Sequence, residues 1–422
     1  MSAALNLGSE FRMTEPASMS PNLGGRVTGA AGLPRTGLAA LLAAADLPGE
    51  IELPSGAIVA VGVGEPRYRV TFRSEDALRT PLTEIAIGQA FVSGDIDVEG
   101  DLAALFRVRA ALREQVPMRQ RLRFLYDFMR SPLKMNKQAV TAHYSRGDDF
   151  YLTFIDKRFR FYSQGLFQHP GETIEQASEH KLETMLAALD LQPGARLLDI
   201  GGGWGGVTQY CGERGVHVTT LTLAEDSANH IRALLADNNL PGEVLLEDFL
   251  THRPSQPYDH AVIYGVIEHL PDYRRFAAKA WDVLKPGGRL YLDASASIQK
   301  FSVSSFTRDH IWGGRHTYMT LQDVITEMLY HGFEVLDVTR ETRDYELTML
   351  EWAKRLDAAK DDIIARWGEK TYRAFRLFLW GGTHAFNVNA LQAYHLVVER
   401  TVDPGPRPSR LRRLVEFLAG LR

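Results

Sequence analysis

The stretch Arg196-Leu-Leu-Asp-Ile-Gly-Gly-Gly-Trp-Gly-Gly206 decides the fold of this 422-residue chain. Its first five residues form an apolar run typical of a buried strand, and the next six are five glycines and a tryptophan. A glycine-rich turn between a strand and a helix lets a ligand approach the backbone closely. The first turn of the helix also offers N–H groups to ligand acceptors. We therefore predict a nucleotide-type binding site at this turn.

Strand-like and helix-like segments alternate from Arg196 onward. Strands are expected at 196–200, 217–223, 243–248, 260–265 and 288–295, and helices near 207–214, 227–238 and 273–284. This alternation is typical of an α/β fold with a doubly wound, mostly parallel sheet. Two later apolar runs, 333–339 and 393–398, are expected to add edge strands, and the span between them is mostly helical and rich in aromatic residues.

Composition and charge exclude several classes of protein. The chain is 45% hydrophobic and 24% charged, and it has no apolar stretch approaching the ~20 residues of a membrane span. Its start lacks the basic and apolar segments of a secretory signal, so we predict a cytoplasmic protein. The single cysteine, Cys211, excludes an internal disulfide and a multi-cysteine zinc site, and we expect no metal. A net charge of −4 argues against a nucleic-acid partner.

The chain is predicted to have five parts. They are a flexible arm (1–35), a small α+β amino-terminal domain associated with lipid or membrane (36–115), a basic amphipathic linker (116–140), the domain with the glycine turn (141–400) and a basic amphipathic tail (401–422). In the amino-terminal domain we expect helices at 38–45, 81–90 and 102–112 and small antiparallel strands at 50–53, 57–63 and 68–72. This domain has no cluster of nucleophile, base and acid, so we expect the chemistry elsewhere.

Two segments combine basic residues with apolar residues at helical spacing. Residues 118–137 contain six Lys or Arg and a single acid, Asp127, and residues 407–422 repeat the pattern. Such segments suit an anionic membrane surface. The alternative is that each helix packs its apolar side on the protein's own core.

The order Asp-x-Gly-x-Gly in the turn resembles the S-adenosylmethionine (SAM) site of class I methyltransferases more than a dinucleotide fingerprint. The resemblance implies that Asp199 steadies the cationic amino end of SAM. It also implies that the second strand contacts the ribose at Thr222-Leu223 and that the third reads the adenine at Glu247-Asp248. The turn Lys285-Pro-Gly-Gly288 before the fifth strand is a familiar companion of this fold.

Beyond the turn, the chain resembles the cyclopropane fatty acid synthase family and its mycolic acid methyltransferase relatives. The motifs that carry the resemblance are 85–91, 93–100, His143-Tyr144, 147–151, Phe161-Tyr162-Ser163, the glycine turn and Glu268-His269. It implies a Rossmann-like methyltransferase that uses SAM on an unsaturated acyl chain, usually of a membrane phospholipid. The cofactor-binding residues it implies are Tyr162, Ser163, Asp199, Gly201, Gly203, Trp204, Thr222, Leu223, Glu247 and Asp248.

The chemistry of that reaction makes further demands on the site. An alkene attacks an electrophilic methyl group and leaves a carbocation on the chain, so water must be excluded and a base must remove a proton. Aromatic walls suit such a cation. The aromatic candidates are Phe161, Tyr162, Trp312, Tyr318, Tyr345 and Trp352, with ordinary core packing as the alternative role.

The resemblance also implies a base, because cyclopropane synthases hold a bicarbonate with a Cys, a Glu, a His and a Tyr. Here Glu268 and Tyr345 match, but Gln164 replaces the Cys and Asp293 replaces the His. A carboxylate at 293 would repel bicarbonate unless it were compensated. We therefore predict that Asp293 is itself the proton acceptor, that Glu268 assists it, and that bicarbonate is not required. The alternative is that Asp293 only caps its strand.

These observations favour methyl transfer to the double bond of a phospholipid acyl chain, giving a methyl- or methylene-branched product. Cyclopropane formation is the first alternative. A non-catalytic protein that binds SAM or lipid is the second. The sequence leaves open the acyl chain, the head group and the oligomeric state, a homodimer included.

Overall fold

The computed structural model describes residues 26–28, 33–45, 47–111, 148–300, 302–312 and 316–403, with five single residues between 409 and 419. The chain divides into two compact units, residues 1–113 and 114–422. Both basic amphipathic segments of the sequence analysis fall largely outside these ranges, 118–137 entirely so.

The first unit is built on a five-stranded mixed sheet. Its strands are β1 (Arg26–Thr28), β2 (Gly49–Glu52), β3 (Ile58–Val61), β4 (Tyr68–Phe72) and β5 (Ile96–Gly100), in the order β1-β3-β2-β4-β5. Its helices are α1 (Leu38–Ala44), α2 (Glu75–Leu78), α3 (Glu84–Ser93), α4 (Leu102–Leu105) and the 3₁₀ helix η1 (Phe106–Ala111). The expectation of antiparallel strands is wrong for one pair, because β2–β4 is parallel. β1, which was not expected as a strand, pairs in parallel with β3. β1 also lies within the predicted flexible arm.

The second unit contains a seven-stranded sheet. Its strands are β6 (Arg196–Ile200), β7 (His217–Thr222), β8 (Gly242–Leu246), β9 (Tyr258–Tyr264), β10 (Leu284–Ala296), β11 (Phe333–Arg340) and β12 (Gln392–Arg400). Their spatial order is β11-β12-β10-β9-β6-β7-β8. β8, β7, β6, β9 and β10 run parallel, and β12 is antiparallel to both of its neighbours. The predicted doubly wound, mostly parallel sheet is confirmed.

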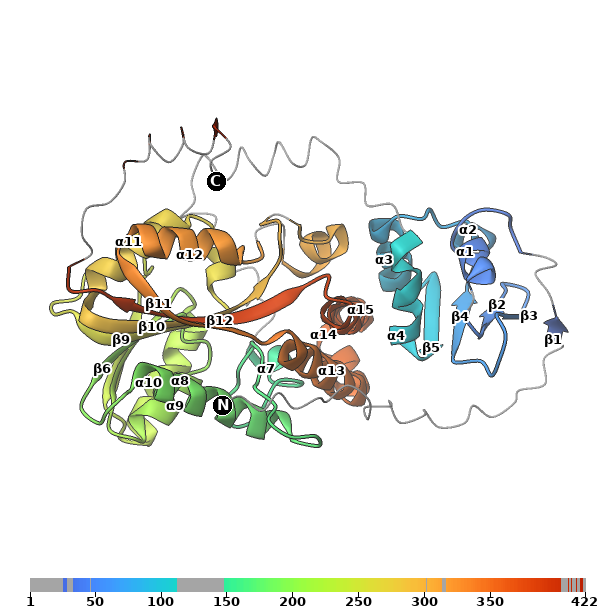
Figure 1. Ribbon diagram of the computed structural model, residues 1–422. Helices are drawn as coiled ribbons and strands as arrows, with labels where there is room; N and C mark the ends of the chain where they lie inside the picture. Colours follow the sequence, from blue (N-terminus) through green and yellow to red (C-terminus); the bar gives the residue numbers. More distant parts are fainter. Residues whose placement is uncertain are drawn as a thin grey trace. The chain divides into compact units, whose positions relative to one another are not determined.

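Helices cover both faces of this sheet (Figure 1). On one face lie α8 (Ile174–Leu189), α9 (Gly206–Gly212) and α10 (Glu225–Asp237), and on the other lie α11 (Tyr273–Val283) and α12 (Leu321–Tyr330). Each face has its own apolar core: Leu182 and Tyr210 belong to one, Phe276 and Met328 to the other. Burial on both faces explains why these strands read as continuous apolar runs.

The remaining helices of this unit are α7 (Asp148–Tyr151), the 3₁₀ helix η2 (Ile267–His269), the π-helix η3 (Thr307–Ile311), α13 (Thr342–Ala358), α14 (Lys360–Trp367) and α15 (Glu369–Asn387). The last three form the predicted aromatic-rich helical span between β11 and β12. The prediction that both late strands lie at an edge is wrong for β12, which pairs with β10 and β11. Its run of four buried residues, His395 to Val398, fits this interior position.

No helix in the described ranges is both long and apolar enough to cross a bilayer.

Candidate active site

The glycine turn joins the carboxyl end of β6 to the start of α9. The Gly201 N–H donates to the Leu221 carbonyl of β7 at 2.9 Å, which fixes the turn on the neighbouring strand. Gly203 has φ +52°, and a Cβ built there would meet no atom within 4 Å. By contrast, a Cβ at Gly202 would lie 2.0 Å from a methyl carbon of Thr220. Gly202 is therefore needed for packing, whereas Gly203 faces open space that a ligand can occupy.

That open space is part of a pocket that is open to solvent, with about 800 Å³ of empty volume when the solvent at its mouth is included. The loop before α8 forms a second wall with Phe159 to Ser163, and the segment after β9 forms a third with Gly265, Val266, Glu268 and His269. Ser295 of β10 and Tyr345 of α13 complete the polar lining. The walls meet because the carboxyl ends of parallel strands share one edge of the sheet.

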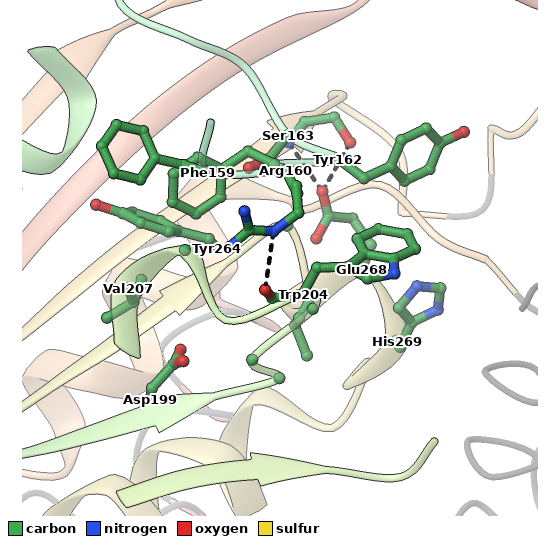
Figure 2. Close-up of a pocket in the computed structure, with 18 of the residues that line it drawn as sticks. Phe159, Arg160, Tyr162, Ser163, Asp199, Trp204, Val207, Tyr264, Glu268 and His269 are labelled. Atoms are coloured by element: carbon green, nitrogen blue, oxygen red, sulfur yellow. Dashed lines mark hydrogen bonds between the residues drawn. The ribbon is translucent and has the colours of Figure 1, made fainter. Parts of the chain in front are cut away.

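Asp199 lies at the base of the pocket and is the second-last residue of β6 (Figure 2). Its side chain is buried, and its Oδ2 accepts a hydrogen bond of 3.4 Å from the Thr220 hydroxyl. Burial raises the pKa of Asp199 from 3.8 to about 7, and the Thr220 bond offsets only part of that effect. A cationic ligand group in the pocket would therefore favour ionised Asp199.

Glu268 is the second buried carboxyl group of the pocket. Its Oε1 accepts hydrogen bonds from the Ser295 N–H at 3.0 Å and from the Ser295 hydroxyl at 2.9 Å. Its Oε2 is buried and accepts no hydrogen bond from any described residue. Burial raises the pKa of Glu268 to about 7, against the lowering effect of the Ser295 bonds. One oxygen thus orients the group, and the other is left without a hydrogen bond.

Tyr345 is the only other predicted catalytic residue that lines the pocket described here. Its ring stacks on Phe386 of α15 with centroids 4.5 Å apart. Burial raises the pKa of Tyr345 well above its ordinary value, so the phenol is a neutral hydrogen-bonding group.

Asp293 lies near the carboxyl end of β10 and is not part of the pocket lining. Its Oδ2 is 2.7 Å from Lys181 Nζ, and both side chains are 1% exposed. Its Oδ1 accepts the Gly265 N–H at 2.9 Å. Burial raises the pKa of Asp293, and the Lys181 charge opposes that rise. Asp293 Oδ1 is therefore hydrogen-bonded, and Oδ2 accepts no hydrogen bond from the described residues but is ion-paired with Lys181. The ion pair disfavours the predicted role of Asp293 as the proton acceptor, because an adjacent positive charge makes a carboxylate a weaker base.

Lys181 was not predicted to take part in the site. Its ammonium donates to Ser163 Oγ at 2.6 Å and lies 3.9 Å from the centre of the Tyr264 ring, and both of those residues line the pocket. The sequence did contain a signal. Lys181 occurs in the buried stripe of α8 formed by Ala177, Ser178, Leu182, Met185 and Leu189. A lysine at a core position implies a buried acidic partner.

Gln164 also lies outside the pocket lining. Its Nε2 donates to Glu341 Oε2 at 2.5 Å, and Glu341 Oε1 lies 2.5 Å from His395 Nδ1. The imidazole reaches Asp337 through Nε2 at 2.9 Å. Gln164 thus connects the pocket loop to β11 and β12, an arrangement that sequence spacing did not predict.

The four residues assigned to the ribose and adenine lie outside the pocket lining described here. Thr222 Oγ1 accepts the Ala224 N–H, and Leu223 follows it at the end of β7. Glu247 is exposed and pairs with His252, whose Nδ1 is 2.8 Å away. Asp248 accepts the Leu250 N–H at 2.8 Å. All four lie near the carboxyl ends of β7 and β8, so their assignment stays a prediction.

Aromatic side chains form much of the remaining lining. Of the six aromatic candidates, Phe161, Tyr162, Trp312 and Tyr345 line the pocket. Tyr318 and Trp352 do not belong to that lining, although Trp352 stacks on Tyr162 at 5.1 Å. Two imidazoles that the sequence analysis did not assign, His269 and His316, also line it. Burial lowers the pKa of His269 to about 4, so this imidazole is neutral.

No group of three His, Cys, Asp or Glu side chains suited to a metal ion occurs within the described ranges.

The strand order and the glycine turn after β6 define the fold of class I SAM-dependent methyltransferases. The sequence profile described as mycolic acid cyclopropane synthetase matches residues 132–396, and the chain therefore belongs to that family. The predicted fold and family are confirmed.

Individual relatives act on or bind different ligands. The sphingolipid C9-methyltransferase of Candida albicans is 27% identical over 286 residues, which cover 64% of this chain and 55% of that protein. The chain thus spans little more than half of that relative. The cyclopropane synthase MmaA2 of Mycobacterium tuberculosis has a TM-score of 0.58 at 27% identity, covering 62% of this chain and 98% of that one. The mycolic acid cyclopropane synthase CmaA1, solved with SAH and CTAB, has a TM-score of 0.58 at 26% identity, covering 62% and 98%.

Proposed function

We propose that this protein transfers the methyl group of SAM to the double bond of an unsaturated fatty acyl chain on a membrane phospholipid. The product is a methyl- or methylene-branched chain. The observation that carries the proposal is Glu268, a buried carboxyl group that lines an aromatic-rich pocket beside the glycine turn, with one oxygen held by Ser295 and the other without a hydrogen bond from the described residues.

The pocket fits the methionine end of SAM. Gly203 leaves open space at the backbone, and the ionised Asp199 carboxylate suits the amino group of the ligand. Tyr162, Ser163, Gly201 and Trp204 line the same space. When bound, SAM supplies a methyl group made electrophilic by the sulfonium.

The acceptor is proposed to be a lipid chain. The relatives include a sphingolipid C9-methyltransferase and a mycolic acid cyclopropane synthase, which supports a lipid as the acceptor. The aromatic lining of this pocket suits an apolar chain and a developing cation on it. The reaction requires that water be kept away from that cation.

Glu268 is proposed as the base, in place of Asp293. The alkene π electrons form a bond to the methyl carbon, the methyl–sulfur bond breaks, and the neighbouring chain carbon becomes cationic. Glu268 Oε2 then takes a proton. Loss of that proton from the adjacent chain carbon gives a methyl-branched alkene. Loss from the methyl carbon after a hydride shift gives a methylene branch, and loss with ring closure gives a cyclopropane.

Membrane association is the second part of the proposal, at the inner face of a cytoplasmic membrane. Leu411, Val415 and Leu418 of the tail are helical and 71%, 56% and 74% exposed. Their spacing of four and three residues puts them on one side of a helix. Arg410, Arg412 and Arg413 accompany them in the sequence, which suits an anionic lipid surface.

Expression in a bacterium with unsaturated phospholipids tests the function. Mass spectrometry of the fatty acid methyl esters should show a gain of one CH₂ per modified chain, and fragmentation should distinguish a branch from a ring. A ring would favour cyclopropane synthesis. SAM binding in calorimetry without any product would favour a non-catalytic protein.

A further inference from the structure

The loop that forms the second pocket wall is held in a strained conformation by its own side chains. Asp156 is fully buried, and its carboxylate accepts the N–H groups of Arg158, Phe159 and Phe161 at 3.1, 2.6 and 2.6 Å. Arg160 lies between the donors Phe159 and Phe161 in the chain, and its φ is +62°.

A positive φ is unusual for this residue type. The other non-glycine residues with positive φ in the described ranges are Asp190, Asn239 and Asn389, whose short polar side chains tolerate it. Arginine has no such advantage, and sparsely populated backbone conformations persist where the surroundings impose them. The contacts of the Arg160 side chain explain what imposes this one.

The guanidinium of Arg160 connects the two pocket walls. Its Nε donates to the Trp204 carbonyl of the glycine turn at 3.2 Å, a bond drawn in Figure 2. Its Nη2 donates to Gln209 Oε1 of α9 at 2.8 Å, and its Nη1 donates to the Arg158 carbonyl of its own loop at 2.7 Å. No carboxylate of the described residues lies within ion-pair distance of Arg160. The hydrogen bonds of the Arg160 guanidinium therefore go to uncharged oxygen atoms, and these belong to the two walls.

We propose that Arg160 is a positioning residue, which fixes the distance between the Asp156–Ser163 loop and the glycine turn and so shapes the cofactor pocket in advance. The planar fork of arginine can hold three separate acceptors at once, which lysine cannot. The inference rests on the proposed function only in that SAM is the ligand of the pocket.

Arg160→Gly is the decisive variant. Glycine adopts a positive φ without strain, which offsets part of the stability lost with the three side-chain hydrogen bonds, so the free protein should still fold. Its affinity for SAM should nevertheless fall by at least ~10-fold, the scale expected for the loss of a charge-assisted hydrogen bond. Added guanidinium ion should restore part of the affinity. Arg160→Lys, which keeps the charge but not the fork, should also bind SAM weakly.

The matched control is Arg158→Ala in the same loop. The Arg158 side chain is 50% exposed, pairs with Glu179 and lies 4.7 Å from the centre of the Phe159 ring. It makes no hydrogen bond to the glycine turn, so its loss should change SAM affinity much less than the loss of Arg160. Hydrogen exchange adds a readout without ligand: the amides of the glycine turn should exchange faster in Arg160→Gly than in the control.

Normal SAM affinity in a folded Arg160→Gly protein would overturn the inference. If that variant does not fold, Gln209→Met decides, because it removes one acceptor without touching the loop. Weaker SAM binding in Gln209→Met would support the inference, and unchanged binding would overturn it. Failure of the wild-type protein to bind SAM would instead reject the proposed function.

Discussion

The buried pair Asp293–Lys181 makes a strong prediction about stability. Asp293→Asn removes the negative charge 2.7 Å from the Lys181 ammonium, in a place where both side chains are 1% exposed. Lys181 would keep the Ser163 hydroxyl and the rings of Tyr264 and Phe161 as partners, none of which carries a negative charge. Breaking a buried ion pair by removing one partner costs about 3–5 kcal/mol, because the other charge stays uncompensated. We expect a loss of that size in the free energy of unfolding.

Urea unfolding at pH 7.5 measures this effect. The double variant Asp293→Asn/Lys181→Met has no uncompensated charge and should regain most of the lost stability. The control is Glu179→Gln, which breaks the half-exposed Arg158–Glu179 pair and should cost less than about 1 kcal/mol.

The same variants separate two roles for Asp293. If the residue balances the charge of Lys181, the double variant should regain measurable turnover. If Asp293 is the proton acceptor, the double variant should be folded and inactive. An Asp293→Asn protein as stable as the wild type would refute the reasoning, because Lys181 would then not need its partner.

Four further predictions follow from the site. Glu268→Gln should lower kcat by at least ~100-fold, the scale expected for a general base, while SAM affinity measured by calorimetry is kept. Because the pKa of Glu268 is raised to about 7 and the base must be ionised, kcat/KM should rise with pH through about 7 and then level off; a profile already flat from pH 5 would count against this base. Gly203→Ala should abolish SAM binding. Gly287→Ala should leave it intact, because Gly287 also has a positive φ, +78°, and free space around a built Cβ but lies outside the pocket. Equal SAM affinities of the two variants would remove the site assignment. Flotation with anionic liposomes should show binding that weakens with salt, and equal binding to neutral vesicles would contradict the electrostatic part of the proposal.

Local sequence patterns predicted most of the second unit. The β6 strand was expected at its observed bounds, and the other strands of the sheet within a few residues, because apolar runs between turn residues are strong local signals. The position of β12 between β10 and β11 was not predicted, since strand order depends on contacts between distant segments.

The site was predictable where it is carried by consecutive residues. The glycine turn and Glu268-His269 do line the pocket. Glu268 replaces Asp293 as the proposed base because Asp293 is paired with Lys181. The two residues are 112 positions apart, so no spacing rule predicts that they meet. The Gln164–Glu341 bond spans 177 positions for the same reason. Burial likewise decides which carboxyl groups carry raised pKa values, and it depends on packing rather than on sequence neighbours.

Transfer of a deuterium-labelled methyl group tests the central claim most directly. Purified protein is incubated with SAM carrying a trideuterated methyl group and with vesicles of an unsaturated phospholipid, in buffer depleted of bicarbonate, and the released fatty acid methyl esters are analysed by mass spectrometry. The account predicts label on the former double bond without added bicarbonate, with three deuterium atoms kept in a methyl-branched alkene and two in a methylene branch. Unlabelled acyl chains, or label that appears only after bicarbonate is added, would contradict it.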